Sequence, residues 1–362
     1  MPADRRRLAF AAVVGFVASL TAAAPARAFC RTTTCGLPPG FAPSPGECYP
    51  PDFEARCAAL SPPVKVLPIY WTNACVSYDV QEAASRQVPY ADASRLFAAA
   101  FAKWTSVTCA GGAGGSGRVS VDVSDLGPVA CDLVQYSSNQ GNQHVIIFHD
   151  DTWPHDDSVN TLGLTTITFD PDSGEIYDAD MEINSTPPYP LSLGDPPPTG
   201  YDFQSIIQHE TGHFLGMAHS GEAGATMLAR YMPGTTTMRT LGTDDTDGIC
   251  SIYLPDGNRA VDTSVAASGA VAEAACDPTP RHGFQSECAQ PQPSTGVGCS
   301  LSSAPSQLAG GGAPLSAAAA LALALGACVR RRRGAADSNV ITEAPHAPAV
   351  AARRAPRRRH AR

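Results

Sequence analysis

Residues 209–219 read His-Glu-Thr-Gly-His-Phe-Leu-Gly-Met-Ala-His, and this stretch predicts a metal site on a helix. His209 and His213 are four residues apart, so a helix places both imidazoles on one face, within reach of a single ion. Zinc is the ion that this spacing favours. Glu210 lies beside the two ligands, where its carboxylate is a candidate general base.

The chain supplies a third ligand just after this helix. Gly216 is expected to end the helix, because glycine adopts the left-handed conformation that other residues resist. The chain then turns back and offers His219 to the same ion. Three protein ligands leave the fourth tetrahedral position of zinc to water, which is typical of catalytic rather than structural sites. Apolar residues around the motif recur with the period of a buried amphipathic helix: Phe203, Ile206, Ile207 and Phe214.

The motif and the residues after it resemble the metzincin metallopeptidases, and within them the matrixin branch. Met227 lies eight residues after His219, at the position of the family's Met-turn. Ser220 and Tyr231 match residues of the matrixin branch, and the tyrosine belongs to the wall of the S1′ specificity pocket there. Residues 241–253 are similar to the last matrixin helix, with its Asp-Asp pair and terminal tyrosine.

This resemblance implies an α+β fold of the metzincin type: a mixed five-stranded sheet with three helices, in which the Met-turn follows the active-site helix. It also implies a zinc-dependent endopeptidase with one catalytic ion. Two positions depart from the family pattern, since Ala229 replaces a proline of the S1′ wall and Cys250 replaces a polar residue of the last helix. The implied roles are metal ligand for His209, His213 and His219, general base for Glu210, support beneath the metal for Met227 and pocket wall for Tyr231.

Residues 65–256 are predicted to form one metallopeptidase domain, which is long enough to bury a core. Residues 29–64 are rich in Cys and Pro and are expected to form an irregular segment held by disulfides, and residues 257–298 to form a linker or stalk. Hydrophobic periodicity predicts a helix over 90–107 and strands over 76–80, 118–123, 144–149, 164–169 and 176–183.

The first 28 residues are typical of a secretory signal peptide. Arg5 to Arg7 precede an apolar run over 8–24, and Ala-Arg-Ala at 26–28 is a small-x-small cleavage site, so the mature chain is expected to start at Phe29. An uncleaved membrane anchor is the alternative, although the apolar run is short for a span. The adjacent arginines also permit a twin-arginine export route.

The composition agrees with export. The whole chain has 25 basic and 34 acidic side chains; residues 1–28 hold four and one of these, and residues 330–362 hold ten and two, which leaves 11 basic and 31 acidic in between. The resulting charge of −20 disfavours binding to nucleic acid or anionic lipid. Ten cysteines predict up to five disulfides, whose pairing remains open: Cys30, Cys35, Cys48, Cys57, Cys75, Cys109, Cys131, Cys250, Cys276 and Cys288.

The C-terminal part carries a second targeting pattern. Cys299, in Gly-Cys-Ser, precedes a flexible spacer, an apolar run over 313–329 and four arginines at 330–333. The run is just long enough to cross a bilayer, with the arginines on the cytoplasmic side. This order resembles the Gly-Cys type of bacterial sorting signal (MYXO-CTERM), in which the cysteine marks the processing site. A plain membrane anchor or an Ala-rich tail would also fit this composition, and the basic residues 334–362 are expected to be disordered.

The residue pattern suggests two further metal sites, both weakly. Residues 170–174 read Asp-Pro-Asp-Ser-Gly, which makes calcium a second candidate ion, but the glycine is one place early for a calcium loop and a hairpin turn is favoured. The family resemblance makes His149, Asp151 and His155 candidates for a second, structural zinc site like that of animal matrixins. Their spacing fits such a site poorly, so surface polar residues are the favoured interpretation.

Cys35 begins a Cys-Gly-Leu-Pro stretch that resembles the core of the matrixin cysteine switch, in which a thiolate binds the zinc of the zymogen. The flanking residues of that motif are missing and Cys30 is close by, so a structural disulfide is favoured.

These features favour an exported or surface-displayed zinc endopeptidase that acts as a monomer on proteins or peptides, and that contacts the membrane through its C-terminal segment before processing. A non-catalytic surface protein or adhesin that retains the fold is the alternative, and a self-processing maturation factor is a third. The intact ligand set and the presence of Glu210 favour the enzyme.

Overall fold

The computed structural model describes only part of the chain: residues 29–38, 41–112, 114–155, 161–187, 189–261 and 270–290, and the backbone of 339–343. The predicted signal peptide, Cys299, the apolar run and the arginine cluster lie outside the described residues. Within the part that is described, no helix has the length and apolar character needed to cross a membrane.

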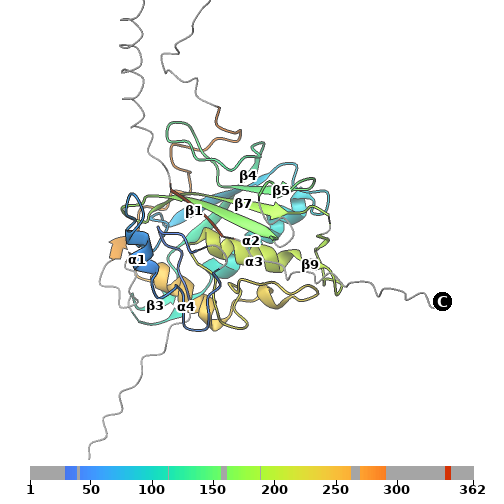
Figure 1. Cartoon of the computed structure of the whole chain (residues 1–362). Helices are drawn as coiled ribbons and strands as arrows, with labels where there is room; N and C mark the ends of the chain where they lie inside the picture. Colours follow the sequence, from blue (N-terminus) through green and yellow to red (C-terminus); the bar gives the residue numbers. More distant parts are fainter. Residues whose placement is uncertain are drawn as a thin grey trace, which may run out of the picture.

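A mixed sheet forms the centre of the molecule (Figure 1). Four of its strands, in the order β4-β1-β5-β7, are parallel, and β6 pairs antiparallel with β7. These five strands confirm the expected mixed five-stranded sheet. Their bounds are Cys75–Gln81 for β1, Asp122–Val129 for β4, Val145–His149 for β5, Gly163–Phe169 for β6 and Ile176–Asn184 for β7.

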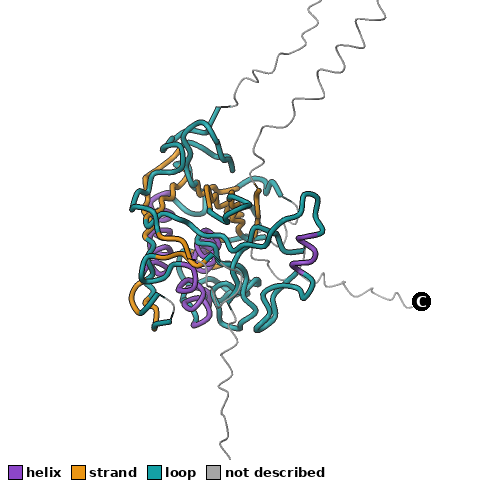
Figure 2. The backbone as a smooth tube through the Cα atoms, turned by 90° about the vertical axis from the view of Figure 1, so that its left-hand side faces the viewer, coloured by secondary structure: helices purple, strands orange, loops and turns teal. Residues whose placement is uncertain are grey.

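Helices α2 (Tyr90–Thr105) and α3 (Phe203–Phe214) pack together against one face of this sheet, with strands above and helices below in Figures 1 and 2. The third expected helix is α4 (Thr243–Ile252). Helix α2 buries a stripe with helical spacing, which is why the sequence pattern located it correctly: Ala93, Leu96, Phe97, Ala100, Phe101 and Trp104. Smaller elements are α1 (Phe53–Ala58), η1 (Thr237–Arg239), and the paired strands β8 (Leu191–Ser192) and β9 (Tyr201–Asp202).

Strand β1 shows how the sheet separates an apolar face from a polar one. Tyr78 stacks on Phe101 of α2, with ring centroids 4.7 Å apart. Successive side chains of a strand point to opposite faces, so the neighbouring Asp79 faces away from the helices. On β7, Asp178 and Asp180 alternate in the same way with core residues. The face away from α2 and α3 therefore buries carboxylates beneath the loops that cover it.

The prediction of a strand over 118–123 is wrong in its position. The structure has β3 (Ser116–Arg118) paired with β2 (Thr108–Ala110), and the sheet strand β4 begins only at Asp122. Val119 and Val121, which created the alternating pattern, are buried in the connection between the two strands. Because β4 pairs only with β1 in the described sheet, its own side chains are largely exposed and carry no apolar alternation.

The ten cysteines form five disulfides: Cys30–Cys48, Cys35–Cys57, Cys75–Cys276, Cys109–Cys250 and Cys131–Cys288. Two of them attach residues 270–290 to the domain, and β10 (Asn258–Ala260) pairs with β11 (Ala270–Ala272). The described part of the segment expected to be a linker is therefore fixed to the domain. Disulfides and backbone hydrogen bonds hold it, and neither produces an apolar period in the sequence.

The basic tail also differs in part from the expectation of disorder. Residues Asn339–Glu343 form strand β12, which pairs antiparallel with β6 at the edge of the sheet. An edge strand offers unpaired backbone groups to any extended segment, so this pairing requires no side-chain pattern.

The buried carboxyl of Asp79 predicts a pH-dependent stability. Burial, together with the charge of Asp125, raises the pKa of Asp79 to about 7. An acid with a raised pKa in the folded state favours the protonated form, so stability falls as the pH rises from about 4 to about 7. In Asp79→Asn the titrating group is gone, and its free energy of unfolding relative to the parent should rise by about 1 to 4 kcal/mol between pH 4 and pH 8.

Urea unfolding of both proteins under the same metal conditions measures this difference. The exposed control Asp132→Asn should show no such rise. A difference between Asp79→Asn and the parent that does not change with pH would contradict the assignment.

Candidate metal centre

The start of helix α3 is fixed by a buried aspartate. Asp202 caps the helix, since its carboxylate accepts hydrogen bonds from the backbone N–H and the hydroxyl of Ser205. The guanidinium of Arg239 donates to both carboxylate oxygens of Asp202, at 2.6 and 2.7 Å. The helix that carries the first two predicted ligands therefore begins at a point tied to η1.

The end of the helix follows the prediction for Gly216. The helix stops at Phe214, and Gly216 has a φ of +89°. This is the left-handed region that favours glycine. A Cβ at this position would also lie 3.0 Å from the carbonyl oxygen of Ile69, so the turn passes directly against the backbone of a neighbouring segment.

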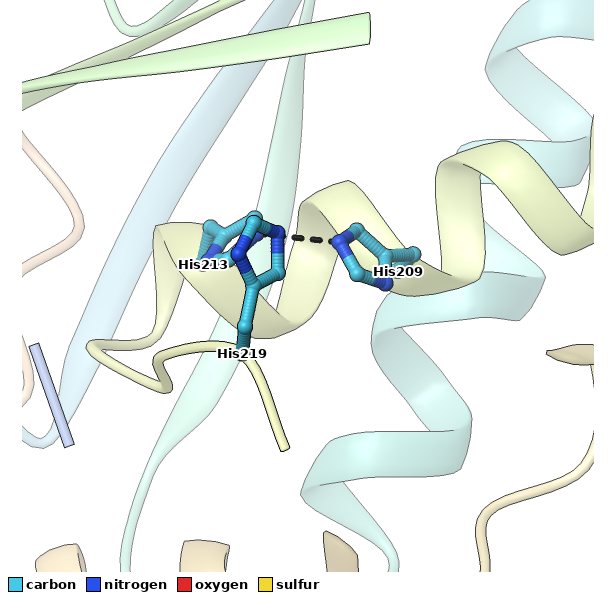
Figure 3. A group of neighbouring side chains, drawn as sticks. All are labelled: His209, His213 and His219. Carbon is cyan, nitrogen blue, oxygen red and sulfur yellow. Dashed lines mark hydrogen bonds between the residues drawn. The ribbon is translucent and has the colours of Figure 1, made fainter. Parts of the chain in front are cut away.

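His209, His213 and His219 converge, and all three are buried (Figure 3). One ring nitrogen from each lies within 4.8 Å of the others, and this is the only such group of potential metal ligands among the described residues. The Nε2 atoms of His209 and His213 are 3.0 Å apart. The motif therefore brings together the three residues that were predicted from its spacing.

Backbone carbonyl groups orient two of these rings. The Nδ1 of His209 is 2.7 Å from the oxygen of Thr226, and the Nδ1 of His213 is 2.9 Å from the oxygen of Met217. A carbonyl oxygen can only accept, so each Nδ1 carries the hydrogen and each Nε2 presents its lone pair to the centre of the cluster. Burial, reinforced by the charge of His213, lowers the pKa of His209 and keeps it neutral. This donor set fits a zinc ion.

Glu210 is buried next to the ligands and is held by strand β6. The hydroxyl of Thr165 donates to its Oε2 at 2.6 Å. Two residues earlier on the same face, Gly163 leaves room for the carboxylate, because a Cβ there would lie 2.6 Å from Oε1. Neither residue was identified from the sequence. The only signal in the sequence was their alternate spacing at the start of the strand expected over 164–169, which the structure extends by one residue to Gly163.

Met227 packs against Gly212 of helix α3, and its carbonyl accepts a hydrogen bond from the backbone N–H of Ser220, the residue after His219. The carboxylate of Asp245 in α4 accepts hydrogen bonds from the backbone N–H groups of Thr226, Met227 and Gly242. The Met-turn also provides the carbonyl that orients His209. One residue of the predicted Asp-Asp pair thus fixes the Met-turn, and through it a candidate ligand.

Gly212 explains why the helix and the Met-turn approach so closely. A Cβ at Gly212 would lie 2.3 Å from the Sδ of Met227 and 2.8 Å from the ring of Trp104. The indole nitrogen of Trp104 also donates to the carbonyl of Gln208. The glycine between the two candidate ligands His209 and His213 is therefore a packing requirement.

Tyr231 is almost fully buried, and its hydroxyl group joins two segments. It donates to the carbonyl of Thr235 at 2.5 Å and accepts from the backbone N–H of Asp202 at 2.9 Å. The segment after the Met-turn is thereby attached to the start of α3. Cys250, which departs from the family pattern, forms a disulfide with Cys109.

The second zinc site suggested by His149, Asp151 and His155 is not assembled. His149 and His155 each place Nε2 within hydrogen-bonding distance of a different oxygen of Glu182, at 2.7 and 2.8 Å. Asp151 instead forms an ion pair with Arg86. Glu182 was not anticipated from the sequence, and it makes the two histidines partners of a buried carboxylate rather than simple surface residues.

The contacts of Asp170 and Cys35 show structural roles for both residues. Asp170 accepts hydrogen bonds from the backbone N–H groups of Asp172 and Ser173, which is the geometry of the favoured hairpin turn between β6 and β7. Cys35 is paired with Cys57, so the favoured structural disulfide is confirmed.

Comparison with known proteins gives consistent matches to this domain. The matrixin family model, Peptidase M10, matches residues 70–254. Neutrophil collagenase of Homo sapiens is 29% identical over 167 residues, which cover 45% of this chain and 32% of the relative. Metalloendoproteinase 1 of Glycine max is 34% identical over 110 residues, covering 29% of this chain and 32% of the relative.

A further match is matrix metalloproteinase-16 of Homo sapiens, which is 31% identical over 147 residues, covering 38% of this chain and 23% of the relative. The chain therefore spans about a third or less of the length of these three relatives.

Gly212→Ala tests the close approach of helix and Met-turn. Helix propensity alone predicts a gain of about 1 kcal/mol. The crowding at Met227 and Trp104 opposes it, and overpacking of this kind costs about 1 to 3 kcal/mol. We expect a net loss of stability in denaturant unfolding, whereas the control Gly194→Ala, which adds a methyl group into open space, should stay within about 0.5 kcal/mol. A stabilised Gly212→Ala would contradict the packing argument.

Proposed function

Since the chain belongs to the matrixin family, we propose that it is a zinc-dependent endopeptidase that hydrolyses peptide bonds in extracellular proteins. The observation that carries this proposal is the buried histidine cluster with Glu210 held beside it. The family is zinc-dependent, and three neutral imidazoles with one open position are the donor set of a catalytic rather than a structural zinc ion.

His209, His213 and His219 would hold the ion. A zinc ion bound there would supply Lewis-acid chemistry, which polarises a scissile carbonyl and lowers the pKa of water. The chain's own contribution is proton transfer and orientation. Glu210 takes the proton of the attacking water and delivers it to the leaving amine. The hydroxyl of Thr165 holds one carboxylate oxygen of Glu210, so the acceptor is oriented before substrate arrives.

Substrate selection is proposed to involve Tyr231 and the segment that follows it. The attachment of Tyr231 to both Asp202 and Thr235 fixes this side of the site relative to α3. Ala229 is smaller than the proline found in the family pattern, which changes the shape of the S1′ wall. Mapping of cut sites in a peptide library would test whether a distinct side-chain preference results.

Replacing Glu210 separates metal binding from catalysis. Glu210→Ala should still bind one zinc ion per chain, and its rate of casein cleavage should fall by about 10²- to 10⁴-fold, because that is the typical contribution of proton transfer by a positioned side chain. Chelation should abolish cleavage by the parent, and added zinc should restore it. The exposed control Glu82→Ala should keep full activity. If Glu210→Ala cleaves casein as fast as the parent, the mechanism is wrong.

The same measurement decides between an enzyme and a non-catalytic surface protein with this fold. A parent that binds zinc and cleaves no protein or peptide in a broad library would favour the non-catalytic protein. Cleavage of its own chain alone would favour the self-processing factor.

We also propose that the protein is exported and then held at the cell surface. Five disulfides support export, because such bonds persist in oxidising compartments. Residues 1–28 would be removed as a signal peptide, and Cys299 would mark the site of C-terminal processing. Mass spectrometry of the surface fraction tests this. Protein recovered in the medium with its sequence intact to Arg362 would contradict anchoring.

A further inference from the structure

The N-terminal segment lies alongside the turn that leads to the third histidine. The backbone N–H of Thr32 donates to the carbonyl of Gly216 at 3.0 Å, and the N–H of Ala218 donates to the carbonyl of Cys30, also at 3.0 Å. The hydroxyl of Thr32 donates to the carbonyl of Met217 at 2.9 Å. The three residues before His219 are thus hydrogen-bonded to the first residues of the described chain.

The Met217 carbonyl links this contact directly to the ligands. It accepts the hydroxyl of Thr32 and also lies 2.9 Å from the Nδ1 of His213. A displacement of the turn would therefore move the acceptor that orients His213 as well as the backbone that carries His219.

The segment is itself firmly attached to the domain on its other side. The carbonyl of Thr32 accepts the N–H of Ile69 at 2.9 Å. The buried guanidinium of Arg31 donates to the carbonyls of Ile69 and Ala260, at 3.2 and 2.7 Å. The turn before His219 is therefore hydrogen-bonded to a short N-terminal segment, and that segment is itself hydrogen-bonded to Ile69 and Ala260 of the domain.

The same segment also reaches the far side of His219. A Cβ on Gly221 would lie 2.2 Å from the carbonyl carbon of Ser44, so the backbone near Ser44 packs directly against the chain after the ligand. The disulfide between Cys30 and Cys48 closes a loop that contains both contacts. One covalently closed loop therefore contacts the chain before His219, through Cys30 and Thr32, and the chain after it, through Ser44.

We propose that the loop closed by Cys30–Cys48 positions His219 and so sets the affinity of the site for zinc. The proposal rests on the proposed function only in that the three histidines bind zinc. Groups that orient metal ligands from behind typically contribute about 10- to 100-fold to metal affinity. Without the closed loop, the turn from Gly216 to Gly221 loses hydrogen bonds on one side and a packing surface on the other, and the third ligand is no longer held near the first two.

The two N-terminal disulfides provide a matched pair of variants. Cys30→Ser with Cys48→Ser opens the loop that contacts the ligand turn. Cys35→Ser with Cys57→Ser opens a loop of similar length; the sequence separations are 22 residues for Cys35–Cys57 and 18 for Cys30–Cys48. Both loops contain Ser44, but only the Cys30–Cys48 loop contains the hydrogen bonds of Cys30 and Thr32 to the turn before His219. Metal-free full-length protein of each kind is titrated with zinc in competition with a chromogenic chelator.

We expect the first double variant to bind zinc about 10- to 100-fold more weakly than the parent, and the second to remain within about threefold. Circular dichroism of the metal-free proteins checks that both are folded. Equal zinc affinity in the two double variants would overturn the proposal.

A milder change keeps all disulfides and guards against misfolding. Thr32→Val removes only the hydroxyl that donates to Met217, and Thr34→Val, whose hydroxyl donates to the carbonyl of Lys65, is its control. Thr32→Val should weaken zinc binding by several-fold and Thr34→Val should not; the reverse order would contradict the proposal. Since no substrate is used, a parent that binds zinc but cleaves nothing contradicts the peptidase function alone.

Discussion

Two backbone carbonyl groups orient the two imidazoles of helix α3, and the geometry of the candidate metal centre depends on them. The oxygens of Thr226 and Met217 fix the Nδ1 atoms of His209 and His213. A helix alone places two histidines on one face, but it does not choose their tautomers or the planes of their rings. Both carbonyls belong to the segment that follows helix α3, so the geometry of the candidate metal centre depends on the contacts that hold this segment in place.

The two ends of the domain supply these anchors. Asp245 of α4 binds the backbone of the Met-turn, and the N-terminal segment binds the turn before His219. They meet at Gly248, where a Cβ would lie 2.2 Å from the Cε of Met217 and 3.1 Å from the Cβ of Phe29. Segments separated by more than 200 residues in sequence thus share one contact behind the ligands, and glycine is the residue that lets them approach.

The sequence was sufficient for those parts of the fold and the site that have a fixed period or spacing. Helix α2, the helix of the motif and strands β5 to β7 follow from apolar periodicity, and His209, His213 and His219 converge as their spacing predicts. Glu210 with Met227 came from the motif and the family resemblance. All of these patterns are local, since each is complete within about 20 residues of chain.

The contacts that were missed join groups that are far apart in the sequence, and they include side-chain hydrogen bonds, backbone hydrogen bonds and disulfides. Thr165 reaches Glu210 across 45 positions, and the attachment of residues 270–290 relies on disulfides to Cys75 and Cys131. The position of strand β4 was predicted wrongly, because an exposed edge strand carries no alternation of apolar and polar residues. Hydrogen bonds between backbone atoms do not require particular residue types. The contact between Thr32 and Gly216 therefore could not be inferred from the sequence.

The lengths of the loops that the disulfides close indicate which disulfides contribute most to global stability and which act mainly on local geometry. In the chain-entropy view, a cross-link stabilises more as the loop it closes grows, from about 3 kcal/mol for about 15 residues to nearly 5 for about 100. Cys30–Cys48 joins residues only 18 apart, whereas Cys75–Cys276 joins residues 201 apart. The shortest loop therefore contributes least to global stability by this mechanism, yet it contacts the chain on both sides of His219. In the role that we propose for it, this loop acts locally: it orders the backbone around His219, so that zinc binding would depend on a bond that forms under oxidising conditions.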